Sequence, residues 1–264
     1  MDRIDDDIIP LYRFETEVDY ESADLAGEPQ VGYCSLDHPH HLATVADDVH
    51  SLLKNQKELF SDLRPKYDVS GVTMFQSSGR HQISLRAIAM FDSRSKGYMI
   101  DVFFPIVRNE RATATLRIEE IIEFNNGQEA VITASMGETK LTFFDIDYCL
   151  NGKKYRIGEC YPFSLAALCY SAEPFRGGAP EIASAEGRYP DDALFIANVM
   201  STPRKTSFRH SNFLIMDVAL TPAREGEQPI VIPLTVSTLY FERKPRKNTL
   251  IRGRLWLQGK LVNK

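Results

Sequence analysis

The feature that most constrains the fold of this chain is a series of short β-type segments joined by tight turns between residues 112 and 158. Asn126-Gly127 and Asn151-Gly152 are pairs that accept the positive φ of a type I′ hairpin turn, and Gly137-Glu138 suits a type II′ turn. The segments that flank these turns are rich in β-branched and aromatic residues. They predict an antiparallel meander, with strands at residues 113–124, 129–136, 141–150 and 153–157.

The segment before the meander has a different periodicity. Residues 41–64 carry apolar side chains at three- and four-residue steps, which is the spacing of one helical face, and Pro65 ends the pattern. The sequence therefore predicts one long amphipathic helix. Short strands are expected after it, at residues 72–76, 82–91 and 98–107.

The chain after the meander combines several patterns. Residues 163–170 lack alternation and are rich in Ala and Leu, which predicts a short buried helix. Residues 173–212 are rich in Pro, Gly and Ser and predict a long loop around one apolar segment at 193–200, a candidate strand. Three further strands are expected, at residues 213–220, 230–241 and 250–261.

The order of a meander, a short helix and further strands resembles the OB-fold, a five-stranded barrel with a helix between its third and fourth strands. Residues 143–148, 155–170 and 253–259 are also similar to parts of an uncharacterised bacterial protein family. We therefore expect a mostly β, α+β fold in two domains. Residues 1–110 would form an acidic N-terminal α/β portion with the amphipathic helix, and residues 111–264 an OB-like antiparallel barrel. The resemblance implies no activity.

Composition narrows the class of protein. The chain has 264 residues, of which 43% are hydrophobic, so it can bury a sizeable core. It has no apolar run of the roughly 18 residues that a membrane span needs, and its acidic start is unlike a secretory signal. Its 4 cysteines form no close pair, which is typical of a reducing compartment. These features predict a cytoplasmic protein with no membrane partner and, since nucleotide and nucleophile motifs are absent, no cofactor.

The net charge of −5 hides a polarised chain. Residues 1–50 hold 13 acidic and 2 basic side chains, whereas residues 201–264 hold 12 basic and 4 acidic ones. Such a separation favours a non-catalytic binding protein whose two ends meet complementary surfaces. Its partner would be another protein or a single-stranded nucleic acid.

The last strand is where a binding surface is expected. Strict alternation separates an apolar face from a face that carries cations and the only tryptophan, and a basic loop precedes the strand. A cationic surface with an aromatic platform suits single-stranded nucleic acid, which makes that function an alternative. The competing interpretation is the solvent face of an edge strand, which Arg and Lys commonly fill; alternatively, the acidic first fifty residues fold over the basic strand and neutralise it. A structural role is favoured because the chain as a whole is not basic. The candidate binding residues are Lys244, Arg246, Lys247, Arg252, Arg254 and Trp256.

Two further groups of side chains are weaker candidates. Asp145 and Asp147 alternate to one face of a predicted strand, about 6.5–7 Å apart, so a hydrolase that uses this carboxylate pair is a second alternative. His38, His40 and His41 are potential metal ligands, but their spacing is more typical of a polar helix start than of a metal site.

Overall fold

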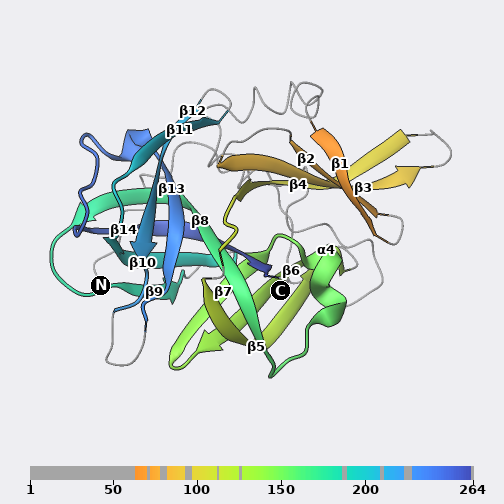
Figure 1. Ribbon diagram of the computed structural model, residues 1–264, viewed down its shortest axis with the longest axis horizontal. Coiled ribbons are helices and arrows are strands. Elements are labelled where there is room, and N and C mark those ends of the chain that lie inside the picture. The colour runs from red at the N-terminus through yellow and green to blue at the C-terminus, as the bar shows by residue number, and fades with distance from the viewer. Residues whose placement is uncertain are drawn as a thin grey trace.

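A computed structural model describes most of the chain after residue 62. The described residues are 63–69, 72–77, 82–92, 97–111, 113–124, 127–185, 189–208, 211–222 and 228–262. They form two sheets, of four and ten strands (Figure 1). The predicted amphipathic helix lies outside the described residues, except for Leu63 and Arg64, which begin a strand.

The smaller sheet is an antiparallel meander. It contains β1 (Leu63–Val69), β2 (Val72–Ser77), β3 (Ile83–Asp92) and β4 (Gly97–Val107) in that order. The three strands expected here from composition are confirmed. The predicted α/β character of this region is wrong, because the described part of it consists of strands alone.

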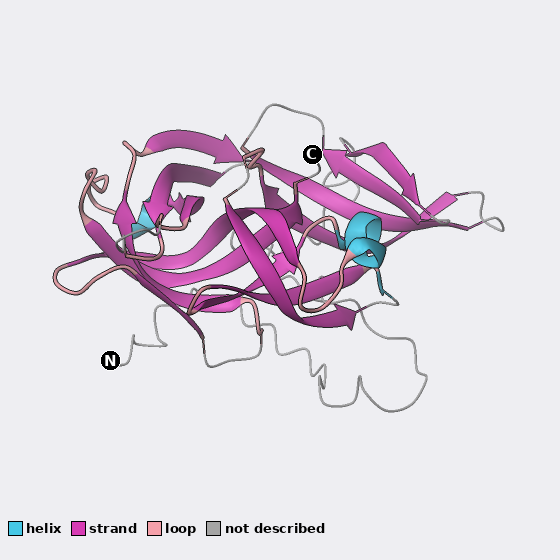
Figure 2. Ribbon diagram, turned by 60° about the horizontal axis from the view of Figure 1, so that its bottom comes forward, coloured by secondary structure: helices cyan, strands magenta, loops and turns pink. Residues whose placement is uncertain are grey.

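The larger sheet holds the remaining strands and is mixed. It contains β5 (Ala114–Phe124), β6 (Glu129–Met136), β7 (Thr139–Asp145), β8 (Cys160–Phe175), β9 (Glu181–Ser184), β10 (Asp192–Val199), β11 (Arg204–Phe208), β12 (Ser211–Ala219), β13 (Val231–Ser237) and β14 (Leu250–Leu261). Among the described residues, three short helical elements connect strands of this sheet: α4 (Tyr148–Asn151), η4 (Gly152–Lys154) and η5 (Thr238–Tyr240), drawn in cyan in Figure 2.

The pairings of this sheet close into two rings that share β8 and β14. In the first ring, β5, β6 and β7 form the first three strands of the predicted four-stranded meander. β7 pairs in parallel with β14, and β8 pairs with both β14 and β5. In the second ring, β14 pairs with β10, β10 with β12, β12 with β13, and β13 in parallel with β8. The long strands β8 and β14 therefore form a wall between the two rings.

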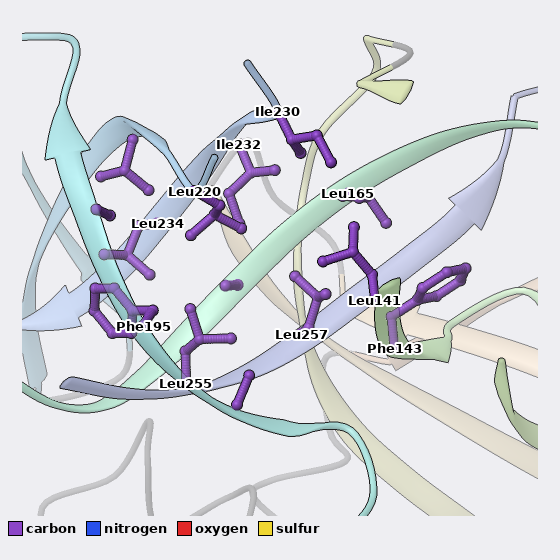
Figure 3. Close-up of a cluster of buried hydrophobic side chains, with 14 of the residues drawn as sticks. Leu141, Phe143, Leu165, Phe195, Leu220, Ile230, Ile232, Leu234, Leu255 and Leu257 are labelled. Atoms are coloured by element: carbon purple, nitrogen blue, oxygen red, sulfur yellow. The ribbon is translucent and has the colours of Figure 1, made fainter. Parts of the chain in front are cut away.

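Each of the shared strands is buried on both faces. One face of β8 places Leu165 and Ala167 in a core to which every ring strand contributes (Figure 3). The other face places Ala166 and Leu168 in a second core, against apolar side chains of β3 and β4. The four-stranded sheet thus packs on the outside of the wall, and the two sheets share a continuous apolar contact.

This double burial explains the main errors in the predicted fold class. A strand with two apolar faces shows no alternation, so residues 163–170 were expected to be helical but are the middle of β8. The long loop at 173–212 contains β9, β10 and β11. The α+β class with an antiparallel barrel is therefore replaced by a mostly β fold with a mixed ten-stranded sheet. The domain division at residues 110 and 111 stays a prediction.

The predicted turns have different outcomes. Gly127 and Gly137 have φ values of 79° and 58°, as tight hairpin turns require. Gly152 has a helical φ of −50°, so the turn predicted there is wrong, and residues 152–154 form η4 instead of a strand. A Cβ at Gly152 would lie 2.7 Å from the Tyr148 ring, so this glycine permits a close approach of the ring and supplies no positive φ. No helix in the described ranges is long and apolar enough to cross a membrane.

Candidate functional site

The predicted binding face of β14 is the side on which the four-stranded sheet packs. Trp256 is completely buried, its ring centroid lies 5.5 Å from that of Phe144, and its indole N–H donates a hydrogen bond to Asp191 Oδ2 at 2.5 Å. Gln258, two residues on, donates to the Pro105 carbonyl at 2.7 Å and accepts from the Val107 N–H at 3.0 Å. The alternation predicted for β14 is confirmed, but this ring has no surface on which a nucleotide base could stack.

The cations on the same face are each paired with a carboxylate. Arg254 contacts Asp192 at 2.9 Å, and Asp192 is fully buried. Lys260 contacts Glu110 at 3.0 Å. These carboxylates belong to described strands and loops of the fold, so the pairing does not depend on the acidic residues 1–50, which lie outside the described residues.

Arg252 and the buried Asp192 show how this face is neutralised. Arg252 contacts Glu173 at 2.6 Å and lies over the Phe175 ring at 5.0 Å from its centroid. Burial raises the pKa of Asp192 to about 6, while the charge of Arg254 and a hydrogen bond from Tyr170 act in the opposite direction. Each cation of this face therefore has a carboxylate partner, and the buried Trp256 and Gln258 lie between them.

The loop before β14 is different. We call residues 242–249 the basic loop. Its cations Arg243, Lys244, Arg246 and Lys247 are all exposed, and no ion pair joins any of them to a carboxylate within the described residues. Glu242 is the single acidic residue of this loop.

The backbone of the basic loop is fixed at both ends. Phe241, immediately before it, is buried in the core of the rings. At the other end, Asn248 donates its N–H to the Val199 carbonyl at 2.7 Å, and Val199 donates to the Thr249 carbonyl at 2.9 Å. Asn248 has a φ of 64°, a conformation that Asn adopts more readily than most residues. The loop therefore presents its charges from a defined backbone.

A fifth cation lies at the same end of the second ring. Phe175, the last residue of β8, pairs with Leu250, so the exposed Arg176 follows directly beside the basic loop. Figure 1 shows the two segments together at the left end of the molecule, the dark-blue loop before β14 and the green link that leaves β8. We call the basic loop and Arg176 together the cationic end.

An exposed apolar side chain lies just before the basic loop. Leu239 in η5 is 82% exposed, the largest value among the big hydrophobic side chains of the described residues. Its N–H donates to the Ser237 hydroxyl at 3.3 Å, which caps the short helix. Neither residue is a candidate in the sequence. The exposure of Leu239 depends on η5, and the proximity of Arg176 to the basic loop depends on the register of β8 against β14.

The carboxylate pair is divided between a strand and a turn. Asp145 ends β7 and is buried; its Oδ2 accepts from the Tyr155 hydroxyl at 2.6 Å and its Oδ1 from the Asp147 N–H at 2.9 Å. Asp147 pairs with the buried Arg86 of β3, which also donates to the Ile146 carbonyl at 2.6 Å. Both carboxylates are thus occupied by contacts that join the turn after β7 to neighbouring parts of the fold.

The ionisation of this cluster follows from its burial. Desolvation raises the pKa of Asp145 to about 7, although hydrogen bonds from Tyr155 and from the Asp147 N–H oppose the increase. The nearby Cys149 thiol also has its pKa raised by burial, to about 12, so it is protonated at neutral pH and is a poor nucleophile. This cluster therefore contains acids with raised pKa values, Asp145 and Cys149, but no activated nucleophile.

The proposed metal ligands remain untested. His38, His40 and His41 lie outside the described residues. Within the described part of the chain, no three His, Cys, Asp or Glu side chains gather as metal ligands.

In comparisons with known proteins, no family model, curated protein or solved structure matches the chain. The similarity to an uncharacterised bacterial family therefore stays a prediction.

Proposed function

We propose that the protein is a non-catalytic binding protein that contacts a polyanionic partner through its cationic end. The observation that carries this proposal is the contrast between two neighbouring groups of cations. Those on β14 have carboxylate partners inside the fold, whereas the four of the basic loop are exposed and have no ion pair to a described carboxylate. Exposed like charges on a fixed backbone repel one another, and an anionic partner relieves that repulsion.

The geometry supports binding more strongly than catalysis. A hydrolase would need Asp145 and Asp147 to face a substrate, but both contact protein groups, and Asp145 is buried. Single-stranded nucleic acid is one class of polyanion. It would be held by the basic loop through its phosphates, without stacking on Trp256. A role for the acidic residues 1–50 stays a prediction, because they lie outside the described residues.

The OB-fold resemblance also stays a proposal. The first ring has five strands, with α4 and η4 between the third and the fourth in chain order. The helix on which the resemblance was based, at residues 163–170, is instead the middle of β8. Five further strands, β9 to β13, intervene between its fourth and fifth strands. OB-folds often bind extended polymers, so this arrangement is compatible with a binding role but assigns no site.

Heparin chromatography tests the proposed function. A protein with a net charge of −5 should pass through a heparin column unless it has a local cationic surface. We expect the full chain to be retained at low salt and the Lys244→Gln/Lys247→Gln variant to elute at clearly lower salt. The matched control, Arg111→Gln/Lys153→Gln, removes two exposed cations elsewhere and should elute with the wild type. Equal elution of all three proteins, or no retention of the wild type, would contradict the proposal.

A further inference from the structure

Leu239 distinguishes among the polyanions that the cationic end could bind. It precedes Arg243 by four residues, so their Cα atoms lie within about 14 Å of each other. The side chain is 82% exposed, on a helical turn that is capped by Ser237 and followed by the buried Phe241. The fold therefore holds an apolar side chain in water beside a group of exposed cations that form no ion pair with a described carboxylate.

Nucleic acid accounts poorly for this combination. Bases need exposed aromatic faces on which to stack. Near the cationic end, Phe241 is buried, Phe175 is covered by the guanidinium of Arg252, and Tyr240 is partly buried. An exposed leucine contributes nothing to phosphate binding.

A protein partner also accounts poorly for it. Protein interfaces of standard size are built on several apolar or aromatic anchors surrounded by polar residues. Among the described residues, the other large hydrophobic side chains that are exposed are Ile122 on β5 and Ile157 in the segment between η4 and β8. Both belong to the first ring, so Leu239 would be an isolated anchor.

An anionic bilayer surface satisfies both features. Lys and Arg are attracted to anionic headgroups, and a single aliphatic side chain beside them can enter the apolar boundary, which is continuous and needs no matching pocket. We propose that the cationic end docks on an anionic lipid surface, with Leu239 inserted below the headgroups and the cations of the basic loop among them. This inference rests on the proposed function and names its partner. It departs from the prediction of no membrane partner, which was based on the lack of an apolar run long enough to span a bilayer and does not bear on docking at its surface.

Vesicle flotation with the full chain tests the inference. The probes are vesicles of phosphatidylcholine alone and vesicles of phosphatidylcholine mixed with phosphatidylserine. We expect the wild type to float with the mixed vesicles at low salt and to remain unbound with the neutral ones. Each cation near an anionic surface contributes about fivefold to affinity, so Lys244→Gln/Lys247→Gln should bind about thirtyfold more weakly. Leu239→Gln should bind about tenfold more weakly.

Matched controls separate the local effect from general changes in charge and hydrophobicity. Arg111→Gln/Lys153→Gln removes two exposed cations elsewhere, and Ile157→Gln removes an exposed aliphatic side chain from the first ring. Both variants should bind the mixed vesicles like the wild type. Circular dichroism of every variant verifies that the fold is retained before its binding is interpreted.

The other outcomes are distinct. Loss of binding on charge removal without any loss in Leu239→Gln would overturn the insertion of Leu239. Binding to heparin or to an oligothymidine but not to mixed vesicles would overturn the lipid inference and leave the proposed function standing. Absence of binding to all of these polyanions would remove the proposed function itself.

Discussion

The basic loop and β14 are adjacent in the sequence and both carry several cations, yet the surroundings of these cations are opposite. On β14, cross-strand neighbours and the four-stranded sheet supply partners for Arg254, Trp256 and Gln258. The basic loop connects η5 to β14 without such neighbours, and its cations stay exposed. The basic residues near the C-terminus therefore belong to two groups with different roles. Pairing stabilises the fold in one region, and exposed charge is available for a partner in the other.

The largest expected effect is at the centre of the β14 face. Trp256→Ala should lower the free energy of unfolding by about 3–5 kcal/mol, because it opens a cavity between the two sheets and removes the donor to Asp191. Urea denaturation measures this change. Trp256→Phe keeps most of the ring and should cost clearly less. A loss below about 1 kcal/mol for the alanine variant would mean that this face does not hold the sheets together.

The next effect concerns a paired cation. Arg254→Met should lower the free energy of unfolding by about 2–3 kcal/mol, because it leaves the buried Asp192 without its cation. The Arg254→Met/Asp192→Asn double variant removes the uncompensated charge and should recover part of the loss. Denaturation of the two variants and of Asp192→Asn alone measures this coupling. Additive losses would show that the two side chains do not act as a pair.

The buried acids should make stability depend on pH. The pKa of Asp145 is raised from 3.8 to about 7 in the folded protein, so its contribution to stability is full below pH 3.8 and is lost as the pH rises toward 7. Within this window, the free energy of unfolding should fall by about 1.4 kcal/mol per pH unit on account of this group. Asp192, with a pKa raised to about 6, acts in the same direction.

Denaturation curves recorded from pH 5 to pH 8 measure this dependence. Asp145→Asn cannot ionise and should show a shallower decrease than the wild type over the same range. Parallel curves for the two proteins would mean that Asp145 does not titrate within the window.

The smallest expected effect is in the basic loop. Lys244→Gln/Lys247→Gln should change the free energy of unfolding by no more than about 0.5 kcal/mol, because both side chains are exposed and have no ion pair to a described carboxylate. Thermal and urea denaturation give this value. A stabilised variant would indicate repulsion within the loop. A strongly destabilised variant would show that the basic loop also stabilises the fold, and the proposed difference between this loop and β14 would be wrong.

Part of this architecture could be predicted from local sequence. The meander and the two faces of β14 follow from turn chemistry and from a period of two, which are properties of neighbouring residues. The second face of β14 is buried because β3 and β4, more than 140 positions earlier in the chain, pack against it, and no local pattern reveals this. For the same reason, the exposed basic loop could be identified, whereas the burial of Trp256 could not.

Two glycines show what a local pattern leaves undetermined. The sequence places Gly253 and Gly259 on the apolar face of β14. A Cβ at Gly253 would lie 1.9 Å from the Ser171 carbonyl oxygen, and one at Gly259 would lie 2.4 Å from the Phe143 ring. Both positions therefore need glycine because another part of the chain approaches too closely for any side chain. That constraint comes from the packing of β8 and β7 against β14.

The position of β14 in the chain has a consequence for how the molecule is made. This strand closes both rings, and its Gln258 and Trp256 contact the elements that seat the four-stranded sheet. A ribosome therefore releases β5 to β13 before either ring can close, and during that interval one edge of β8 lacks its hydrogen-bonded neighbour. Folding that waits for such distant pairings is slow. Until Leu250–Leu261 leaves the exit tunnel, this edge of β8 is available for pairing with strands of other chains.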